Sequence, residues 1–228
     1  MTADDQKRAA GEAAAELVES GMTVGLGTGT TAAWFVKALA ARGLAVKGVA
    51  TSEATAALAT SLGLPMLDID AAGQIDLTVD GADEIGPGLA LIKGAGAALL
   101  REKLVWTISR RCVVIADAGK RQEMLGKKFP LPVEVVAFGH ATTAVRIGQV
   151  LSAGGIAATP QLRFGADGPV RTDNGNLIYD LACEAIDDPA ALAAALKAVT
   201  GVVDHGLFLN LAERALIGTD QGVITLFS

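Results

Sequence analysis

The first 120 residues alternate segments of helical and strand pattern, and this alternation restricts the possible folds more than any other feature of the chain. Segments with apolar residues at helical spacing are 4–20, 30–42, 53–62 and 96–109. Short apolar runs with the composition of buried strands are 22–26, 46–50, 65–69, 75–79 and 112–116. Repeated units of this kind build a parallel sheet with helices on both faces. We therefore predict an α/β fold with a Rossmann-like sheet.

The pattern changes near Lys127, where the proline-containing segment 129–132 has the composition of a linker. Beyond it the predicted strands are 133–137, 159–164 and 176–183, and the predicted helices are 142–151 and 189–199. Two further strands, 215–219 and 223–226, follow near the C-terminus. We predict a large Rossmann-like catalytic domain formed by 1–127 and 205–228, and a small α+β domain formed by 128–204.

Composition excludes several classes of function. The net charge is -6, which argues against a nucleic-acid partner because phosphate backbones require a basic surface. No run of residues is apolar enough to span a membrane, and the N-terminus has no apolar signal core. Cys112 and Cys183 lie in apolar strand-like runs, so we expect buried thiols in a cytoplasmic protein. Neither cysteine has a partner at metal-ligand spacing, and a zinc site is not expected.

A glycine-rich segment, 25–32, joins the first predicted strand to the next helix. Backbone N–H groups and the helix dipole make such a turn a site for anions. The residues that would contact an anion are Thr28, Gly29, Thr30 and Thr31. A dinucleotide site would need an acidic residue at the end of the next strand, and that strand ends in Thr51 and Ser52. The segment alone leaves a phosphate site and a tight structural turn open.

Two further clusters follow predicted strands. Asp80, Asp83 and Glu84 lie at the carboxyl end of a strand, where α/β folds bind ligands. These acids could form a solvated loop, hold a divalent metal or accept hydrogen bonds from sugar hydroxyls. Lys93 begins a second glycine turn and could be an ordinary loop lysine, bind a phosphate or stabilise an oxyanion. Lys7 and Lys120 could converge with it on one anion.

Glu102 lies in a helical segment where all its neighbours three and four residues away are apolar. Those neighbours are Ala98, Leu99, Val105 and Trp106. Burial disfavours the charged form of a carboxylate and raises its pKa, which suits a general base near neutral pH. From these neighbours alone, Glu102 is either a helix-surface glutamate shielded by its long stem or a buried proton-transfer group, and the surrounding motifs favour the second.

These residues together resemble the type A family of ribose-5-phosphate isomerases. The resemblance covers nearly the whole chain in order, and the matching segments are 25–32, 51–52, 80–84, 93–103, 117–120, 129–134 and 172–176. It implies interconversion of ribose 5-phosphate and ribulose 5-phosphate, with Glu102 as the catalytic base. The substrate-binding residues that it implies are Thr28, Gly29, Thr30, Thr31, Asp80, Gly81, Ala82, Asp83, Lys93, Gly94, Ala95, Gly96 and Lys120.

The resemblance also implies that no metal or organic cofactor is needed and that the chain forms a homo-oligomer, a dimer or a tetramer. Two residues depart from the family's usual pattern. Thr30 replaces a serine and keeps the hydroxyl, whereas Ala95 replaces a glycine in the lysine turn. A glycine there would permit a positive φ. If the turn requires a positive φ at residue 95, alanine would not fit its usual geometry.

Three alternatives to the isomerase stay open from the sequence. The first is a sugar-phosphate sensor without catalysis on the same scaffold. The second is a phosphotransferase that holds a divalent metal in the Asp80 cluster. The third is a dehydrogenase that binds a dinucleotide at the first glycine loop.

Overall fold

The computed structural model describes residues 1–228, which form two compact units. Unit 1 comprises Met1–Ala82, Arg101–Arg121 and Asn210–Ser228. Unit 2 comprises Asp83–Leu100 and Gln122–Leu209. The predicted domain boundaries, 1–127 with 205–228 and 128–204, stay a prediction.

Unit 1 is built on a six-stranded sheet with the order β15-β14-β6-β3-β1-β2. The strands are β1 (Thr23–Leu26), β2 (Lys47–Ala50), β3 (Leu77–Gly81), β6 (Cys112–Asp117), β14 (Arg214–Thr219) and β15 (Gly222–Phe227). All neighbouring pairs are parallel except the terminal hairpin, β14 with β15. The prediction of a Rossmann-like parallel sheet is therefore confirmed, with one antiparallel edge strand.

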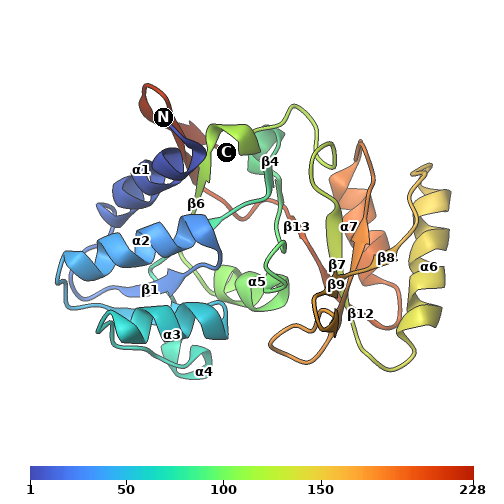
Figure 1. The fold of residues 1–228 in the computed structure, drawn as a ribbon, viewed down its shortest axis with the longest axis horizontal. Helices are drawn as coiled ribbons and strands as arrows, with labels where there is room; N and C mark the ends of the chain where they lie inside the picture. The colour runs from blue at the N-terminus through green and yellow to red at the C-terminus, as the bar shows by residue number, and fades with distance from the viewer. The chain divides into compact units, whose positions relative to one another are not determined.

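Helices cover both faces of this sheet (Figure 1). The helices are α1 (Ala3–Ala15), α2 (Thr30–Ala41), α3 (Glu53–Ser61), α4 (Ile69–Ala72) and α5 (Leu99–Thr107), which enters unit 1 at Arg101. Helices α1 and α2 pack on the face that carries Val24 and Leu26 of β1. Val49 of β2 is paired with Gly25 of β1, a position that alternates with Val24 and Leu26 and so belongs to the opposite face. On that face Val49 packs with Val105 of α5. Separate apolar clusters therefore pack on the two faces of the sheet.

The predicted strand 65–69 is wrong. Met66 makes only a single bridge to Gly48, and Ile69–Ala72 form the short helix α4. The Asp68 carboxylate accepts a hydrogen bond from the N–H of Asp70 at 2.8 Å. This side-chain cap favours a helix start over an extended chain, and the mostly apolar segment 65–69 is too short for its pattern to separate the two.

Unit 2 contains a four-stranded antiparallel sheet with the order β12-β7-β11-β8. Its elements are β7 (Leu131–Val135), α6 (His140–Ala153), β8 (Gln161–Leu162), β9 (Phe164–Gly165), β10 (Gly168–Pro169), β11 (Leu177–Leu181), α7 (Pro189–Lys197) and β12 (Val202–His205). The apolar residues of β7 and β11 form one core with Ile147 of α6 and Leu196 of α7. Antiparallel strands with two helices confirm the α+β character predicted for 128–204.

The sequence did not predict a three-stranded sheet in unit 2. It consists of β4 (Glu84–Ile85), β5 (Leu91–Ile92) and β13 (Leu207–Phe208), with a 3-10 turn, η1 (Pro87–Leu89), between the first two. Strands of two residues are too short to show a period of two, so no pattern could reveal them.

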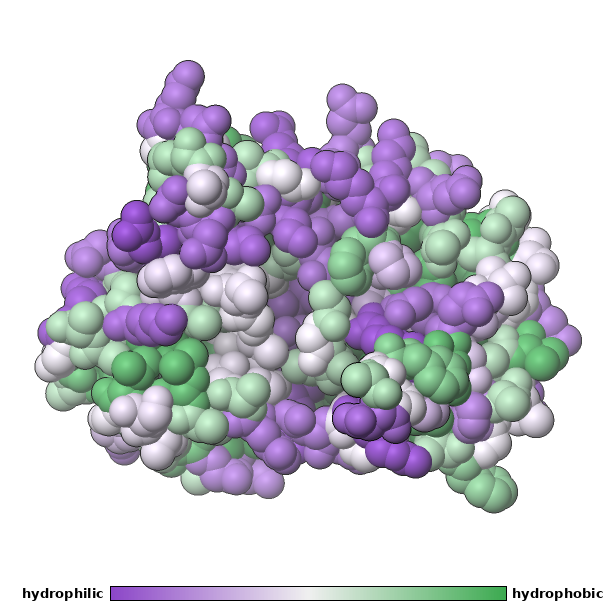
Figure 2. Space-filling model, in the orientation of Figure 1, coloured by the Kyte–Doolittle hydropathy of each residue, from purple (hydrophilic) through white to green (hydrophobic).

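On the face that Figure 2 shows, apolar side chains occur in small patches separated by hydrophilic ones. Such scattered exposure is ordinary for a folded domain. None of the helices combines the length and the apolar character needed to cross a membrane.

Both cysteines are buried and unpaired, as predicted. Burial raises the pKa of Cys112 to about 12 and that of Cys183 to about 11. Because the thiolate is the reactive form, we expect native protein to react slowly with a thiol reagent at pH 8, and faster as the pH rises toward 11. Both thiols should react at once in denaturant. Rapid labelling of the native chain at pH 8 would contradict this expectation.

Candidate functional site

The first glycine loop joins β1 to α2 in unit 1. Gly29 is the residue before the helix and has a φ of 102°, a conformation that favours glycine. No side chain caps the N-terminus of α2, so the first N–H groups of the helix are left for another acceptor. An uncapped helix start beside a glycine loop is suited to an anion such as phosphate.

Asp80 lies against this loop at the end of β3. Its carboxylate is fully buried, and Oδ1 accepts hydrogen bonds from the N–H groups of Thr28 at 3.0 Å and Gly81 at 2.7 Å. A Cβ atom at Gly27 would lie 2.2 Å from that same oxygen. Glycine at position 27 therefore allows the Asp80 carboxylate to lie close to the loop backbone. The hydrogen bonds of this carboxylate then fix the loop.

The Thr28 hydroxyl, one of the predicted anion contacts, lies in a cluster of hydroxyl groups inside unit 1. Oγ1 of Thr28 lies 2.7 Å from Oγ1 of Thr51 and 2.9 Å from Oγ of Ser52. Oγ1 of Thr55 donates to the carbonyl oxygen of Gly27 at 2.9 Å. These contacts hold the glycine loop to the start of α3. Thr51 and Ser52 therefore stabilise the conformation of the loop.

One lysine contacts the loop directly, and a second lies on a turn that is linked to the same helix. Nζ of Lys7 on α1 donates to Oγ1 of the exposed Thr30 at 3.3 Å. The neighbouring Gln6 accepts a hydrogen bond from the N–H of Ala118 at 3.2 Å, at the start of the 3-10 turn η2 (Ala118–Lys120). Helix α1 thus links the turn that carries Lys120 to the loop that carries Thr30.

The close approach at position 27 gives a direct test of the loop. Replacing Gly27 by Ala forces its Cβ against Asp80, so we expect a loss of roughly 1–3 kcal/mol of stability, the usual cost of overpacking. The matched control is Gly148→Ala in α6, where the nearest atom lies 3.8 Å away. Alanine should leave stability unchanged or raise it there. Urea unfolding of both variants checks the pair, and equal effects would contradict this account.

Glu102 lies on α5 and is 4% exposed, as predicted. Its helical neighbours Leu99, Val105 and Trp106 are also buried. Arg101 forms an ion pair with Glu53 on α3, with 3.6 Å between guanidinium and carboxylate. The structure thus places a buried carboxylate on α5, a helix whose other buried residues are apolar.

In unit 2 the acidic residues have separate functions. Glu84 is fully buried and accepts hydrogen bonds from the N–H groups of Gly126, Lys128 and Phe129 at 2.6–2.7 Å. Oδ2 of Asp83 accepts from the N–H of Ala95 at 2.9 Å. No group of three or more His, Cys, Asp or Glu side chains is arranged to hold a metal ion. Glu84 therefore stabilises a loop, which its position beside two other acids did not reveal.

Lys93 precedes the second glycine turn, residues 93–96, which we call the lysine turn. Its side chain is 2% exposed, and Nζ lies 5.4 Å from the ring centre of Phe208, a cation–π contact. Gly94 has a φ of 109°, whereas Ala95 is not among the residues with positive φ. The alanine that replaces the family's glycine is therefore compatible with the turn.

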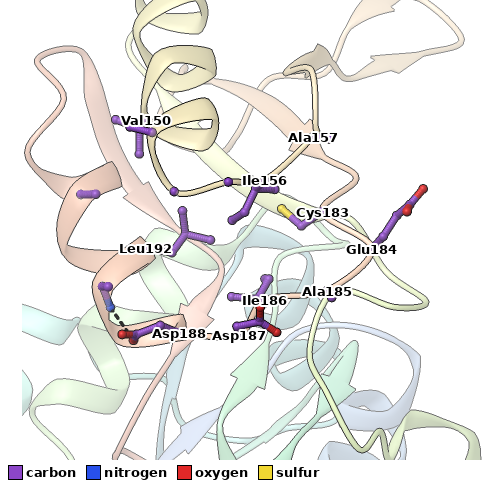
Figure 3. Close-up of a pocket in the computed structure, with 15 residues that line it drawn as sticks. Val150, Ile156, Ala157, Cys183, Glu184, Ala185, Ile186, Asp187, Asp188 and Leu192 are labelled. Atoms are coloured by element: carbon purple, nitrogen blue, oxygen red, sulfur yellow. Dashed lines mark hydrogen bonds between the residues drawn. The ribbon is translucent and has the colours of Figure 1, made fainter.

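Unit 2 also has a pocket that the sequence did not predict (Figure 3). It has a volume of about 650 Å³, and its lining comes from 150–157, 183–188 and 191–195. Figure 3 shows Ile156 beside Cys183, Ile186 next to Asp187, and the Glu184 side chain extending away from this group. The Asp188 carboxylate accepts from the N–H of Ala191 at 2.9 Å and so caps α7. None of the predicted site residues lines this pocket.

Comparison with known proteins identifies the family. Residues 47–222 match the family model described as ribose 5-phosphate isomerase A, or phosphoriboisomerase A. The chain belongs to the ribose 5-phosphate isomerase A family. It is 67% identical to the ribose-5-phosphate isomerase A of Caulobacter vibrioides over 99% of both chains. It is 52% identical to that of Parvibaculum lavamentivorans over 97% of both chains.

Solved structures agree with this family. A D-ribose-5-phosphate isomerase in complex with phospho-erythronic acid has a TM-score of 0.94 and 37% identity over the whole of both chains. The ribose 5-phosphate isomerase A of Methanocaldococcus jannaschii has a TM-score of 0.92 and 36% identity, also over the whole of both chains. The resemblance drawn from the sequence is therefore confirmed.

In this member of the isomerase A family, the predicted site residues divide between the two units. In unit 1, Gly81 lies against Thr28 and Thr31, beside the loop that Asp80 holds. Glu102, Ala82 and Lys120 also belong to unit 1, whereas Asp83 and the lysine turn belong to unit 2. Sequence reasoning missed the supporting contacts of Thr55 and Gln6, since they bridge residues 28 and 112 positions apart.

Proposed function

We propose that the chain interconverts D-ribose 5-phosphate and D-ribulose 5-phosphate. The observation that carries this proposal is a carboxylate, Glu102, buried among apolar side chains of α5 in a chain of this family. A carboxylate removed from water in this way can serve as a general base. Nearly complete coverage by relatives of 67% identity supports the same reaction.

In the proposed reaction, Glu102 removes the proton from C2 of the open-chain aldose. The C–H electron pair forms the C1–C2 double bond of an enediolate, and the aldehyde oxygen O1 becomes an oxyanion. Glu102 then returns the proton to C1, while the proton of the C2 hydroxyl moves to O1. The atoms balance without an oxidant or a reductant.

We assign the phosphate to the glycine loop of unit 1. The uncapped start of α2 and the hydroxyls of Thr30 and Thr31 offer donors, and Lys7 already contacts Thr30. We also assign Lys120 to the phosphate, because the turn η2 that carries it is hydrogen-bonded to α1, the helix of Lys7. The phosphate is remote from C1 and C2, so its binding energy orients the reacting carbons.

The remaining assignments concern the sugar. Asp80, Gly81, Ala82 and Asp83 would hold the linear hydroxyl groups and assist ring opening. Lys93 and the N–H groups of Gly94–Gly96 would stabilise the oxyanion that develops at O1. A buried ammonium has a strong effect there because few water molecules screen its charge.

A direct assay tests this proposal against the alternatives. Purified chain is dialysed against a chelator and given ribose 5-phosphate, and ribulose 5-phosphate is measured by a coupled ketopentose assay. We expect full turnover. Ligand-dependent melting without turnover would identify a sensor, and activity that returns only with Mg²⁺ would identify metal-dependent chemistry. Either result would overturn the proposal.

The finer properties implied by the family are also proposals. We propose a homo-oligomer, a dimer or tetramer, and a cytoplasmic location, the latter because both buried cysteines keep free thiols. Sedimentation of the purified chain tests the first of these. The proposed reaction involves no metal or organic cofactor, no nucleic acid and no membrane.

A further inference from the structure

An arginine distant in sequence contacts the lysine turn of unit 2. Arg163 lies between β8 and β9. Its Nη1 donates to the carbonyl oxygen of Gly94 at 2.9 Å and to that of Ala95 at 3.0 Å. These are successive carbonyl groups of the turn that follows Lys93. One guanidinium nitrogen therefore binds two neighbouring peptide groups.

Asp180 on β11 fixes the orientation of this arginine. Nε of Arg163 donates to Oδ2 of Asp180 at 2.8 Å, and Nη2 donates to Oδ1. The side chains are 14% and 22% exposed, so the pair is largely shielded from water. The backbone N–H of Arg163 also donates to the carbonyl oxygen of Ile178 at 2.9 Å. A planar fork held at both edges has little freedom to move.

The two carbonyl contacts determine where the N–H groups of the turn point. A peptide group is planar and trans, so its N–H points away from its C=O. The carbonyl of Gly94 faces Arg163, and the N–H of the same peptide group, on Ala95, donates to Asp83 at 2.9 Å. The carbonyl of Ala95 also faces Arg163, and this directs the N–H of Gly96 to the opposite side.

The turn needs such a restraint because its backbone has glycines at 94 and 96 and a positive φ at Gly94, and Ala97, the residue directly after it, also has a positive φ. Glycine permits several orientations of the adjoining peptide groups at similar energy. The other end of the turn is held by the hydrogen bond from the N–H of Lys93 to Gly206 at 2.9 Å. Arg163 supplies the restraint in the middle.

We propose that Arg163, held by Asp180, is a positioning residue for catalysis. It orients the lysine turn so that the N–H of Gly96 and the ammonium of Lys93 act together on the oxyanion of the enediolate. This inference rests on the proposed function. It does not require Arg163 to touch the substrate.

The variant Arg163→Met tests this proposal. We expect kcat to fall about 10- to 100-fold, the scale of a misplacement near 1 Å, while KM changes less than about threefold. The inhibition constant of phospho-erythronic acid, whose planar carboxylate resembles the enediolate, should rise by a factor similar to the fall in kcat. Added guanidinium at millimolar concentration should restore part of kcat in Arg163→Met and leave the original chain unchanged.

The matched control is Arg171→Met. Arg171 also donates from Nη1 to a turn carbonyl of unit 2, that of Gly175 at 2.9 Å, but this turn carries no predicted site residue. Its kcat should stay within about twofold of the original. Asp180→Asn should lower kcat in the same direction as Arg163→Met, and the double variant should be no worse than Arg163→Met alone, because Asp180 acts through Arg163.

The outcomes separate this inference from the proposed function. No turnover by the original chain would reject the isomerase itself. Turnover by the original chain with an equal kcat in folded Arg163→Met would reject only the positioning function. If Arg163→Met does not fold, Arg163→Lys takes its place, since lysine keeps the charge without the bidentate fork. A normal kcat in Arg163→Lys would then overturn the proposal.

Discussion

Replacing Glu102 by Gln is expected to lower kcat for ribose 5-phosphate by at least about 10²-fold, the lower end of the usual contribution of a general base. Glutamine has the volume and shape of glutamate, so the apolar surroundings on α5 should stay filled. It cannot accept the C2 proton, and this is the property that the reaction needs. KM should change little, since the proposed function of Glu102 lies in the proton transfer and not in binding.

The control for this variant is Glu16→Gln. Glu16 follows α1, and its largely exposed carboxylate lies 3.5 Å from Arg42. An exposed pair of this kind contributes little to stability, so both stability and kcat should be unchanged. Circular dichroism and thermal unfolding establish that Glu102→Gln is folded. Turnover near the original value in the folded variant would refute the assignment of the base.

The second large effect is expected at Lys93. Replacing it by Met keeps the apolar contact with Phe208 and removes the ammonium. We expect kcat to fall about 10²- to 10³-fold, the range seen when one donor to a developing oxyanion is lost. The measurement is steady-state kinetics, corrected for the folded fraction found by thermal unfolding.

The matched control for Lys93 is Lys37→Met. Nζ of Lys37 lies 4.7 Å from the ring centre of Trp34, so it makes the same type of contact on the exposed side of α2. Its kcat should stay within about twofold. A higher KM with unchanged kcat in Lys93→Met would mean that Lys93 binds substrate and transition state equally. That result would contradict the oxyanion assignment.

Much of unit 1 could be predicted because its signals are local. The period of apolar residues located α1, α2, α3 and α5, and glycines at strand ends located the loop before Thr30. The burial of Glu102 followed from its apolar neighbours three and four residues away, of which Leu99, Val105 and Trp106 lie with it on α5 and Ala98 lies just before the helix. The same approach confirmed the buried thiols.

The remaining features depend on contacts between residues far apart in sequence. Glu84 binds N–H groups more than 40 positions away, so its proximity to Asp80 wrongly suggested a shared acidic site. Thr51 and Ser52 support Thr28 across two elements. Arg163 reaches the lysine turn from 68 and 69 positions away. Local patterns carry no information about such pairs, and only the folded chain reveals them.

The measurement closest to the central claim follows the hydrogen at C2 during incubation with ribose 5-phosphate in D₂O. A carboxylate that removes this proton can exchange it with solvent before returning it to C1. We therefore predict deuterium in the ribulose 5-phosphate made by the original chain, and almost none formed by Glu102→Gln at equal enzyme concentration. Deuterium incorporation by Glu102→Gln at the original rate would show that another group moves the proton.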